Sequence, residues 1–262
     1  MKRVRLDQLL TQRGAFPTRA RAAASVLAGE VLVGPERARA TKPGQLVAED
    51  VQLELPDAQR FVSRGAIKLA NALDALGVPV AGRRALDVGA STGGFTDCLL
   101  RRGAAHVVAL DVAYGQLHWS LRTDPRVTVI ERCNARSLEA GVLPYPPELI
   151  VIDVSFISLR KVLGAVLSCA APRFDCLALV KPQFEVGRSG VASGGVVRDG
   201  RLRRQALVAV GAAALDLGAS VLGYASSGLP GPKGNRESFV WLAEGGRGGV
   251  PDLEAAARGP EP

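Results

Sequence analysis

Residues 87–96 read Asp-Val-Gly-Ala-Ser-Thr-Gly-Gly-Phe-Thr, after a short apolar run at residues 84–86 and before a helix-like segment at residues 96–102. A strand, a glycine turn and a helix in this order are typical of the nucleotide-binding turn of a doubly wound α/β domain. Glycine has no Cβ, so the backbone of such a turn can approach a ligand closely. We therefore expect an α/β domain that binds a nucleoside at this turn.

Apolar runs that alternate with helical patterns continue on both sides of the turn. This alternation predicts a mainly parallel sheet covered by helices on both faces. The candidate strands are residues 84–87, 106–111, 127–131, 149–153, 176–180, 221–226 and 237–242. The candidate helices include residues 64–76, 157–171 and 201–217.

A smaller, basic unit precedes this domain at residues 1–58. Thr18 is a candidate N-cap for a helix over residues 19–28, whose inward positions would be Ala22, Ala23, Val26 and Leu27. A short strand is expected at residues 31–33 and a second β stretch at residues 47–55. We expect a linker at residues 59–63, the α/β domain at residues 64–244, and a flexible Gly-, Ala- and Pro-rich tail at residues 245–262.

The composition restricts the class of protein. The net charge of +8 and the pI near 9.8 favour a polyanionic partner such as nucleic acid. No apolar segment is long enough for a signal peptide or a membrane span, so a cytoplasmic protein is expected. The four cysteines are widely spaced and form no C-x-x-C motif, so we expect reduced thiols and no metal site.

Polar residues follow several predicted strands, where ligands collect in such a sheet. Asp111 lies 24 residues after Asp87, which suits a partner for ribose hydroxyls. Asn134 and Ala135 follow the next strand, where an adenine edge could be met. Two further strands lead into Asp153 and Lys181.

The glycine turn resembles the S-adenosylmethionine turn of methyltransferases. That resemblance implies S-adenosylmethionine as the cofactor. The implied cofactor-binding residues are Asp87, Gly89, Ala90, Ser91, Thr92, Gly93, Gly94, Phe95, Asp111, Asn134, Ala135 and Asp153.

The basic N-terminal unit resembles the S4 RNA-binding domain. The matching segments are residues 5–7, 18–23, 29–33 and 42–44. In that family, basic groups on the second helix and the following turn contact folded RNA. Arg5, Arg19, Arg21 and Lys42 are the corresponding RNA-binding candidates, although a small helical domain with a merely solvated basic surface would show the same pattern.

The segments 61–69, 87–96, 153–159, 181–188 and 231–237, in this order behind the S4-like unit, resemble the TlyA family. Its members join an S4 domain to an FtsJ-type ribosomal-RNA 2′-O-methyltransferase, and the family has also carried the label hemolysin. The Lys-Asp-Lys-Glu tetrad of FtsJ-type enzymes falls on Lys68, Asp153, Lys181 and Glu237. Arg64 and Arg188 are further RNA-binding candidates.

The tetrad suits 2′-hydroxyl methylation, because a lysine with a neutral fraction can accept the proton of a very weakly acidic hydroxyl. We expect Lys181 to be that base or to position the hydroxyl, and Lys68 to be the neighbouring cation. The sequence leaves open which lysine loses its proton.

Three other readings remain at this stage. The tetrad could form two ordinary buried salt bridges, the chain could be a non-catalytic RNA-binding factor, or it could be a membrane-active protein. The favoured reading is methylation of a ribose by a monomer without stable membrane association. The family resemblance implies a cytidine in 23S ribosomal RNA and, in some members, in 16S ribosomal RNA as well, and the sequence leaves open whether one or both subunits are modified.

Overall fold

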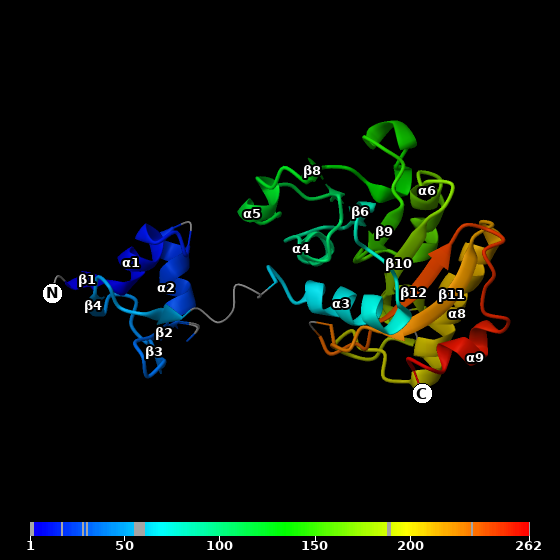
Figure 1. Cartoon of the computed structure of the whole chain (residues 1–262). Coiled ribbons are helices and arrows are strands. Elements are labelled where there is room, and N and C mark those ends of the chain that lie inside the picture. Colours follow the sequence, from blue (N-terminus) through cyan, green and yellow to red (C-terminus); the bar gives the residue numbers. More distant parts are fainter. Residues whose placement is uncertain are drawn as a thin grey trace. The chain divides into compact units, whose positions relative to one another are not determined.

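The computed structural model describes residues 3–16, 18–27, 29, 31–54, 61–187, 190–231 and 233–261. The chain divides into two compact units, Met1–Arg60 and Phe61–Pro262 (Figure 1). The division falls two residues after the boundary that the sequence predicts, and residues 61–63 of the expected linker belong to the second unit. Residues 59 and 60 lie outside the described residues.

The first unit packs two helices against short strands. Leu6, Leu10 and Val26 are fully buried in its core. The helices are α1 (Leu6–Gln12) and α2 (Arg19–Leu27). Strand β1 (Arg3–Arg5) pairs with β4 (Leu46–Ala48), and β2 (Leu32–Val33) pairs with both β3 (Ala38–Arg39) and β5 (Leu53–Glu54).

The sequence predicts the second helix of this unit better than its strands. The backbone N–H of Arg21 donates to Thr18 Oγ1 at 3.3 Å, which confirms the predicted cap. Leu27, expected to face inward, is 70% exposed. The expected β stretch at 47–55 is two strands in different sheets, separated by a turn in which Val51 N–H donates to the Ala48 carbonyl.

The second unit is built on a seven-stranded sheet of order β11-β12-β10-β9-β6-β7-β8. All its strands are parallel except β12, which runs antiparallel to both β10 and β11. The strands are β6 (Arg84–Val88), β7 (His106–Leu110), β8 (Val127–Ile130), β9 (Leu149–Ile152), β10 (Asp175–Val180), β11 (Ser220–Ser226) and β12 (Ser238–Ala243). The strand order reverses between β6 and β9, so the doubly wound α/β prediction is confirmed and the ligand crevice is expected there.

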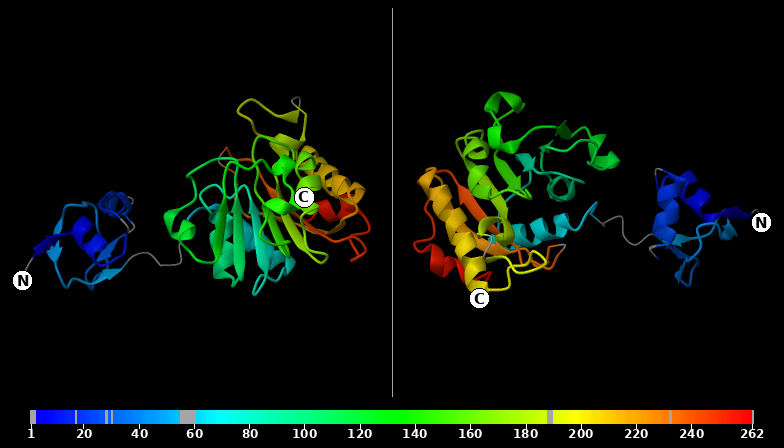
Figure 2. Two further views of the ribbon diagram at one scale, coloured as in Figure 1. Left: turned by 90° about the horizontal axis from the view of Figure 1, so that it is seen from above. Right: turned by 180° about the vertical axis from the view of Figure 1, so that it is seen from behind.

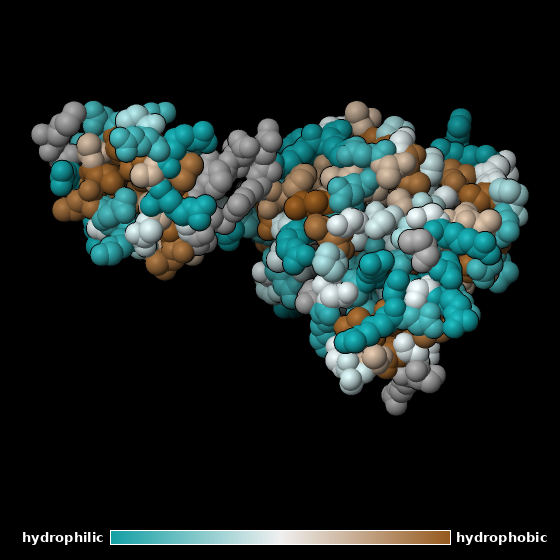
Figure 3. Space-filling view, turned by 90° about the horizontal axis from the view of Figure 1, so that it is seen from below, coloured by the Kyte–Doolittle hydropathy of each residue, from teal (hydrophilic) through white to brown (hydrophobic). Residues whose placement is uncertain are grey.

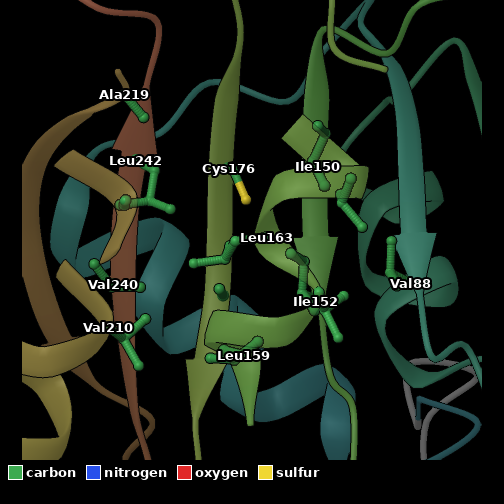
Figure 4. Close-up of a cluster of buried hydrophobic side chains, with 14 of the residues drawn as sticks. Val88, Ile150, Ile152, Leu159, Leu163, Cys176, Val210, Ala219, Val240 and Leu242 are labelled. Carbon is green, nitrogen blue, oxygen red and sulfur yellow. The ribbon is translucent and has the colours of Figure 1, made fainter. Parts of the chain in front are cut away.

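Helices cover both faces of the sheet (Figure 2). Helices α3 (Gly65–Leu76) and α4 (Gly94–Arg101) pack on one face, where Leu149 and Val151 point. Helices α6 (Leu163–Leu167) and α8 (Gly200–Asp216) pack on the other face, with Ile150 and Ile152 (Figure 4). Successive residues of β9 thus enter opposite cores, as both-face burial requires.

The remaining elements of this unit are short. They are α5 (Trp119–Arg122), α7 (Pro182–Glu185), α9 (Leu253–Ala257), and the 3₁₀ helices η1 (Ala135–Ser137), η2 (Ala140–Val142) and η3 (Leu159–Lys161). On the face drawn in Figure 3, apolar side chains are interspersed with polar ones.

Two expectations for this unit are wrong. The predicted helix over residues 157–171 is broken into η3 and α6, with Val162 between them. The expected flexible tail is folded: Ala257 of α9 is fully buried, and Arg203 Nε lies 2.6 Å from the buried Glu261 carboxylate. The burial of Ala257 and the buried Arg203–Glu261 ion pair fix a segment that its composition predicts to be flexible.

Candidate active site

The glycine turn connects β6 to α4 at the point where the strand order reverses. Gly89 has φ +85°, and a Cβ there would lie 2.5 Å from the carbonyl oxygen of Asp153. The position therefore requires glycine, both for its conformation and for the close approach of the segment after β9. Ser91 also has a positive φ, +48°, which is uncommon outside glycine.

Asp87 is fully buried at the start of this turn. Its Oδ2 accepts a hydrogen bond from Thr96 Oγ1 at 2.7 Å. Burial raises the pKa of Asp87 to about 7, and the carboxylates of Asp153 and Asp111 push it in the same direction.

Lys181 and Asp153 form the first of two lysine–carboxylate pairs. Asp153 follows β9 and Lys181 follows β10, the adjacent parallel strand. Lys181 Nζ lies 2.5 Å from Asp153 Oδ1, and it donates a hydrogen bond to Ser155 Oγ at 2.8 Å.

Lys68 and Glu237 form the second pair. Lys68 lies on α3 and Glu237 directly precedes β12, and the Lys68 ammonium donates to Glu237 Oε2. Their side chains are 10% and 2% exposed. A Cβ at Gly231 would lie 2.4 Å from Glu237 Oε1, so the small residue leaves room for the carboxylate. On α3, Ile67 is 41% exposed, whereas Lys68 is buried.

All four residues of the predicted tetrad line one cavity of about 630 Å³. The glycine turn lines it as well, through Asp87, Gly89, Ala90, Ser91, Thr92, Gly94 and Phe95. A cavity of this size is in the range of small-molecule and cofactor sites.

Unpaired polar atoms concentrate in the same cavity. Among the described residues, two buried side-chain oxygens have no partner, Asp87 Oδ1 and Gln183 Oε1, and a third, Asp153 Oδ1, has only its ion pair with Lys181. All three residues line the cavity. Buried acceptors are normally satisfied, so these oxygens mark a place prepared for donors of a bound molecule.

Several cavity residues have no place in the predicted site. Ser155, Phe156, Gln183 and Phe184 line the cavity and closely follow Asp153 and Lys181 at the ends of β9 and β10. Phe156 is 91% exposed, has φ +64°, and its ring centroid is 5.4 Å from that of Phe184. Their position just after two strand ends was the one sequence feature that could have marked them as cavity residues. The backbone conformation and the exposure of Phe156 cannot be predicted from sequence.

Four of the predicted cofactor residues do not line the cavity: Gly93, Asp111, Asn134 and Ala135. The Asp111 carboxylate accepts the backbone N–H groups of Ser91 and Ala113, both at 2.7 Å. It therefore holds the backbone of the glycine turn in place at Ser91. Asn134 Oδ1 accepts from the backbone N–H of Arg136 at the start of η1.

The RNA-binding candidates lie in both units. In the first unit, Arg21 and Lys42 are exposed, and Arg5 and Arg19 both contact the buried Asp7 carboxylate, at 2.8 and 3.2 Å. In the second unit, Arg64 lines the cavity and donates to the Pro230 carbonyl. Arg188 lies outside the described residues.

Two further properties of the described residues concern membrane helices and metal ligands. No helix there combines the length and the apolar character that a bilayer crossing needs. No group of three or more His, Cys, Asp or Glu side chains in those residues is arranged to hold a metal ion.

The fold and this cavity define a Rossmann-like methyltransferase: a nucleoside-type glycine turn at the switch point, with two lysine–carboxylate pairs beside it. The family model of FtsJ-like methyltransferases matches residues 61–244. The chain belongs to the TlyA family of FtsJ-like methyltransferases, as its relatives also show. It is therefore an enzyme rather than a non-catalytic factor on the same scaffold.

The chain is 51% identical over 243 residues to the 16S/23S rRNA (cytidine-2′-O)-methyltransferase TlyA of Mycobacterium tuberculosis, covering 92% of this chain and 90% of that one. It is 37% identical to Hemolysin A of Brachyspira hyodysenteriae, covering 89% and 97%. A solved structure of a hemolysin-named protein from Streptococcus thermophilus matches with a TM-score of 0.73 and 37% identity, covering 98% of this chain and 95% of that one.

Proposed function

We propose that this protein transfers a methyl group from S-adenosylmethionine to the ribose 2′-hydroxyl of a cytidine in 23S ribosomal RNA and, as in the mycobacterial relative, in 16S ribosomal RNA. The observation that carries the proposal is the convergence of Lys68, Asp153, Lys181 and Glu237 on one cavity with the glycine turn. An RNA substrate also agrees with the net charge of +8. From this proposed substrate we infer a cytoplasmic location, with ribosomal RNA or ribosomal subunits as partners.

The cavity fits the cofactor. The unpaired Oδ1 of Asp87 can accept a hydrogen bond from an ammonium or from a ribose hydroxyl, and the missing Cβ at Gly89 lets the backbone approach a ligand. We assign Asp87, Gly89, Ala90 and Asp153 to holding it. When bound, S-adenosylmethionine supplies an electrophilic methyl group on a sulfonium, which leaves as the neutral thioether.

We assign Lys181 as the proton acceptor. As the ribose oxygen forms its bond to the methyl carbon, the 2′-hydroxyl proton passes to Nζ of Lys181, which must be neutral at that moment. Asp153 then stabilises the ammonium that results, from 2.5 Å away. This division of roles needs no metal and leaves the charge of the site balanced.

Lys68 and Glu237 would hold the substrate in place. Their buried pair brings a fixed ammonium and a fixed carboxylate to the cavity wall. The ammonium favours an approaching phosphate, and the carboxylate restrains the ammonium. Positioning of this kind brings the reacting atoms to about 3–3.5 Å, which accelerates the transfer strongly.

The test is methyl transfer to purified ribosomal subunits from labelled S-adenosylmethionine, followed by mapping of 2′-O-methyl nucleotides. We expect wild type to modify a cytidine. We expect Lys181→Ala to bind S-adenosylmethionine normally but to lose at least about 100-fold in rate, the usual contribution of a general base. Lys161→Ala, which removes an exposed lysine outside the cavity, is the control. Methylation on a base atom, or full activity of Lys181→Ala, would contradict the proposal.

A further inference from the structure

Among the described residues, Lys181 Nζ has one side-chain hydrogen-bond partner, Ser155, and one ion-pair partner, Asp153. It lies in the loop after β9, and Lys181 follows β10. Ile152 and Ala178 are the last paired residues of these parallel strands, and Ser155 and Lys181 each lie three residues further on. Because both residues lie equally far beyond the last pair of two adjacent parallel strands, the Ser155 hydroxyl lies close to the Lys181 ammonium.

The two contacts fix the orientation of the nitrogen. A lysine ammonium has three N–H donors around a tetrahedral nitrogen. The contacts to Asp153 Oδ1 at 2.5 Å and Ser155 Oγ at 2.8 Å take up two of these directions. One direction is left, for which the described residues supply no hydrogen-bond or ion-pair partner, and Lys181 lines the cavity.

We propose that Ser155 is a positioning residue that aims the lone pair of neutral Lys181 at the substrate hydroxyl. The inference rests on the proposed function, since it assumes that Lys181 accepts the proton. A neutral amine keeps two N–H groups, and these remain directed at Asp153 and Ser155. The lone pair then occupies the open direction, where the 2′-hydroxyl proton must arrive.

Without the Ser155 hydroxyl, the amine can rotate about its Cε–Nζ bond and place an N–H where the lone pair is needed. Only a fraction of the bound complexes would then be ready to react. Binding of the cofactor and of RNA would be unchanged, because Ser155 acts through Lys181. Ser155 is exposed, so its replacement leaves no buried gap.

The experiment measures single-turnover methyl transfer by the full chain on ribosomal subunits for wild type, Ser155→Ala, Ser155→Thr and Ser168→Ala. Ser168→Ala makes the same change at an exposed serine that caps the C-terminus of α6, outside the cavity. We expect Ser155→Ala to be slower by about tenfold, which corresponds to one hydrogen bond of ordinary strength. The dissociation constant for S-adenosylmethionine, the KM for subunits and the melting temperature should match those of wild type. Ser155→Thr, which keeps the hydroxyl, should recover most of the rate.

The inference is overturned if Ser155→Ala reacts as fast as wild type, if Ser155→Thr is as slow as Ser155→Ala, or if the loss lies in cofactor or RNA binding. These outcomes differ from a failure of the proposed function, in which wild type itself would methylate no ribose. A wild type that is active and a slow Ser155→Ala that Ser155→Thr restores would support it.

Discussion

At the scale of single residues, the raised pKa of Asp87 makes the stability of the fold depend on pH. Its carboxyl is fully buried, with one oxygen bonded to Thr96 and the other unpaired, and its pKa is raised to about 7. The folded state therefore holds a proton that the unfolded chain releases near pH 4. The contribution of Asp87 to folding stability therefore falls as the pH rises through this interval.

Between about pH 4 and pH 7 the folded protein binds one more proton at Asp87 than the unfolded chain does, so the slope of unfolding free energy against pH is negative. Above about pH 7 the slope from this group is zero. The full loss is about 4 kcal/mol from the shift in pKa. Asp87→Asn removes the titration, so we expect its stability relative to wild type to increase from pH 5 to pH 7 and then to stay constant.

Urea unfolding of both proteins at half-unit pH steps, without cofactor, measures that difference. Subtracting the two curves cancels the other titrating groups. A difference that does not change with pH would show that Asp87 titrates at an ordinary value. Weaker S-adenosylmethionine binding by Asp87→Asn is a separate expectation, because the variant replaces one carboxyl oxygen in the cavity with an amide nitrogen, which cannot accept a hydrogen bond.

Residue types at strand ends could be predicted from sequence, but their roles could be predicted only in part. Lys68, Asp153, Lys181 and Glu237 line the same cavity, as their motifs suggested. Their catalytic roles stay predictions. Asp111 has the right spacing from Asp87, yet it binds two backbone N–H groups. Spacing along the chain places a carboxylate near the turn, but it does not tell which neighbour takes up its lone pairs.

At the scale of elements, one carboxylate links the two loops that carry Asp153 and Lys181. Glu185, on α7 directly after Lys181, has a side chain that is 1% exposed. It accepts hydrogen bonds from Ser158 Oγ at 2.6 Å and from the backbone N–H of Leu159 at 2.7 Å. Both partners belong to the segment between Asp153 and α6.

Glu185→Ala should therefore destabilise the protein and slow methyl transfer together. It leaves a buried N–H without an acceptor, and such a group costs about 1–3 kcal/mol. Thermal or urea unfolding would measure the loss, and single-turnover kinetics would measure the effect on Lys181 and Asp153. Glu139→Ala, at an exposed glutamate outside the cavity, is the control and should match wild type. A fully active Glu185→Ala would show that the two loops hold their positions without this link.

Elements with a strong apolar pattern were predicted well, and those held by specific contacts were not. The predicted ends of all seven strands of the large sheet lie within one residue of the observed ends. They could be located because continuous apolar runs reflect burial on both faces. Helix α9 was missed, since its Gly- and Pro-rich surroundings suggest a loose end. It is fixed by the burial of Ala257 and by the Arg203–Glu261 ion pair, which link residues more than fifty positions apart.

At the scale of the whole molecule, we expect the first unit to contribute RNA binding and the second unit to contribute the cofactor site. The second unit contains the complete cavity, since every residue that lines it lies between Ser63 and Glu237. The first unit has its own core and presents basic side chains. We therefore expect substitutions in the first unit to change RNA affinity and to leave the cofactor site untouched.

Arg5 and Arg19 offer the sharpest test of this division. Both contact the buried carboxylate of Asp7, and the hydrogen bond from Arg5 lowers the pKa of Asp7 to about 2. Asp7 thus stays charged at physiological pH and keeps both guanidinium groups on one surface. Guanidinium groups held in this way can bind phosphates with less loss of side-chain entropy.

We expect Arg5→Ala and Arg19→Ala each to weaken binding to ribosomal subunits by about tenfold, which corresponds to one charge-assisted hydrogen bond. The logarithm of the affinity should also depend less steeply on the logarithm of the salt concentration, by about one unit of slope for each lost phosphate contact. Arg37→Ala makes the same change in net charge at an exposed arginine of this unit that pairs with Glu54. It should leave the slope unchanged, and S-adenosylmethionine should bind all three variants as it binds wild type. Equal salt slopes for Arg19→Ala and Arg37→Ala would mean that overall charge, rather than a specific arginine surface, attracts the RNA.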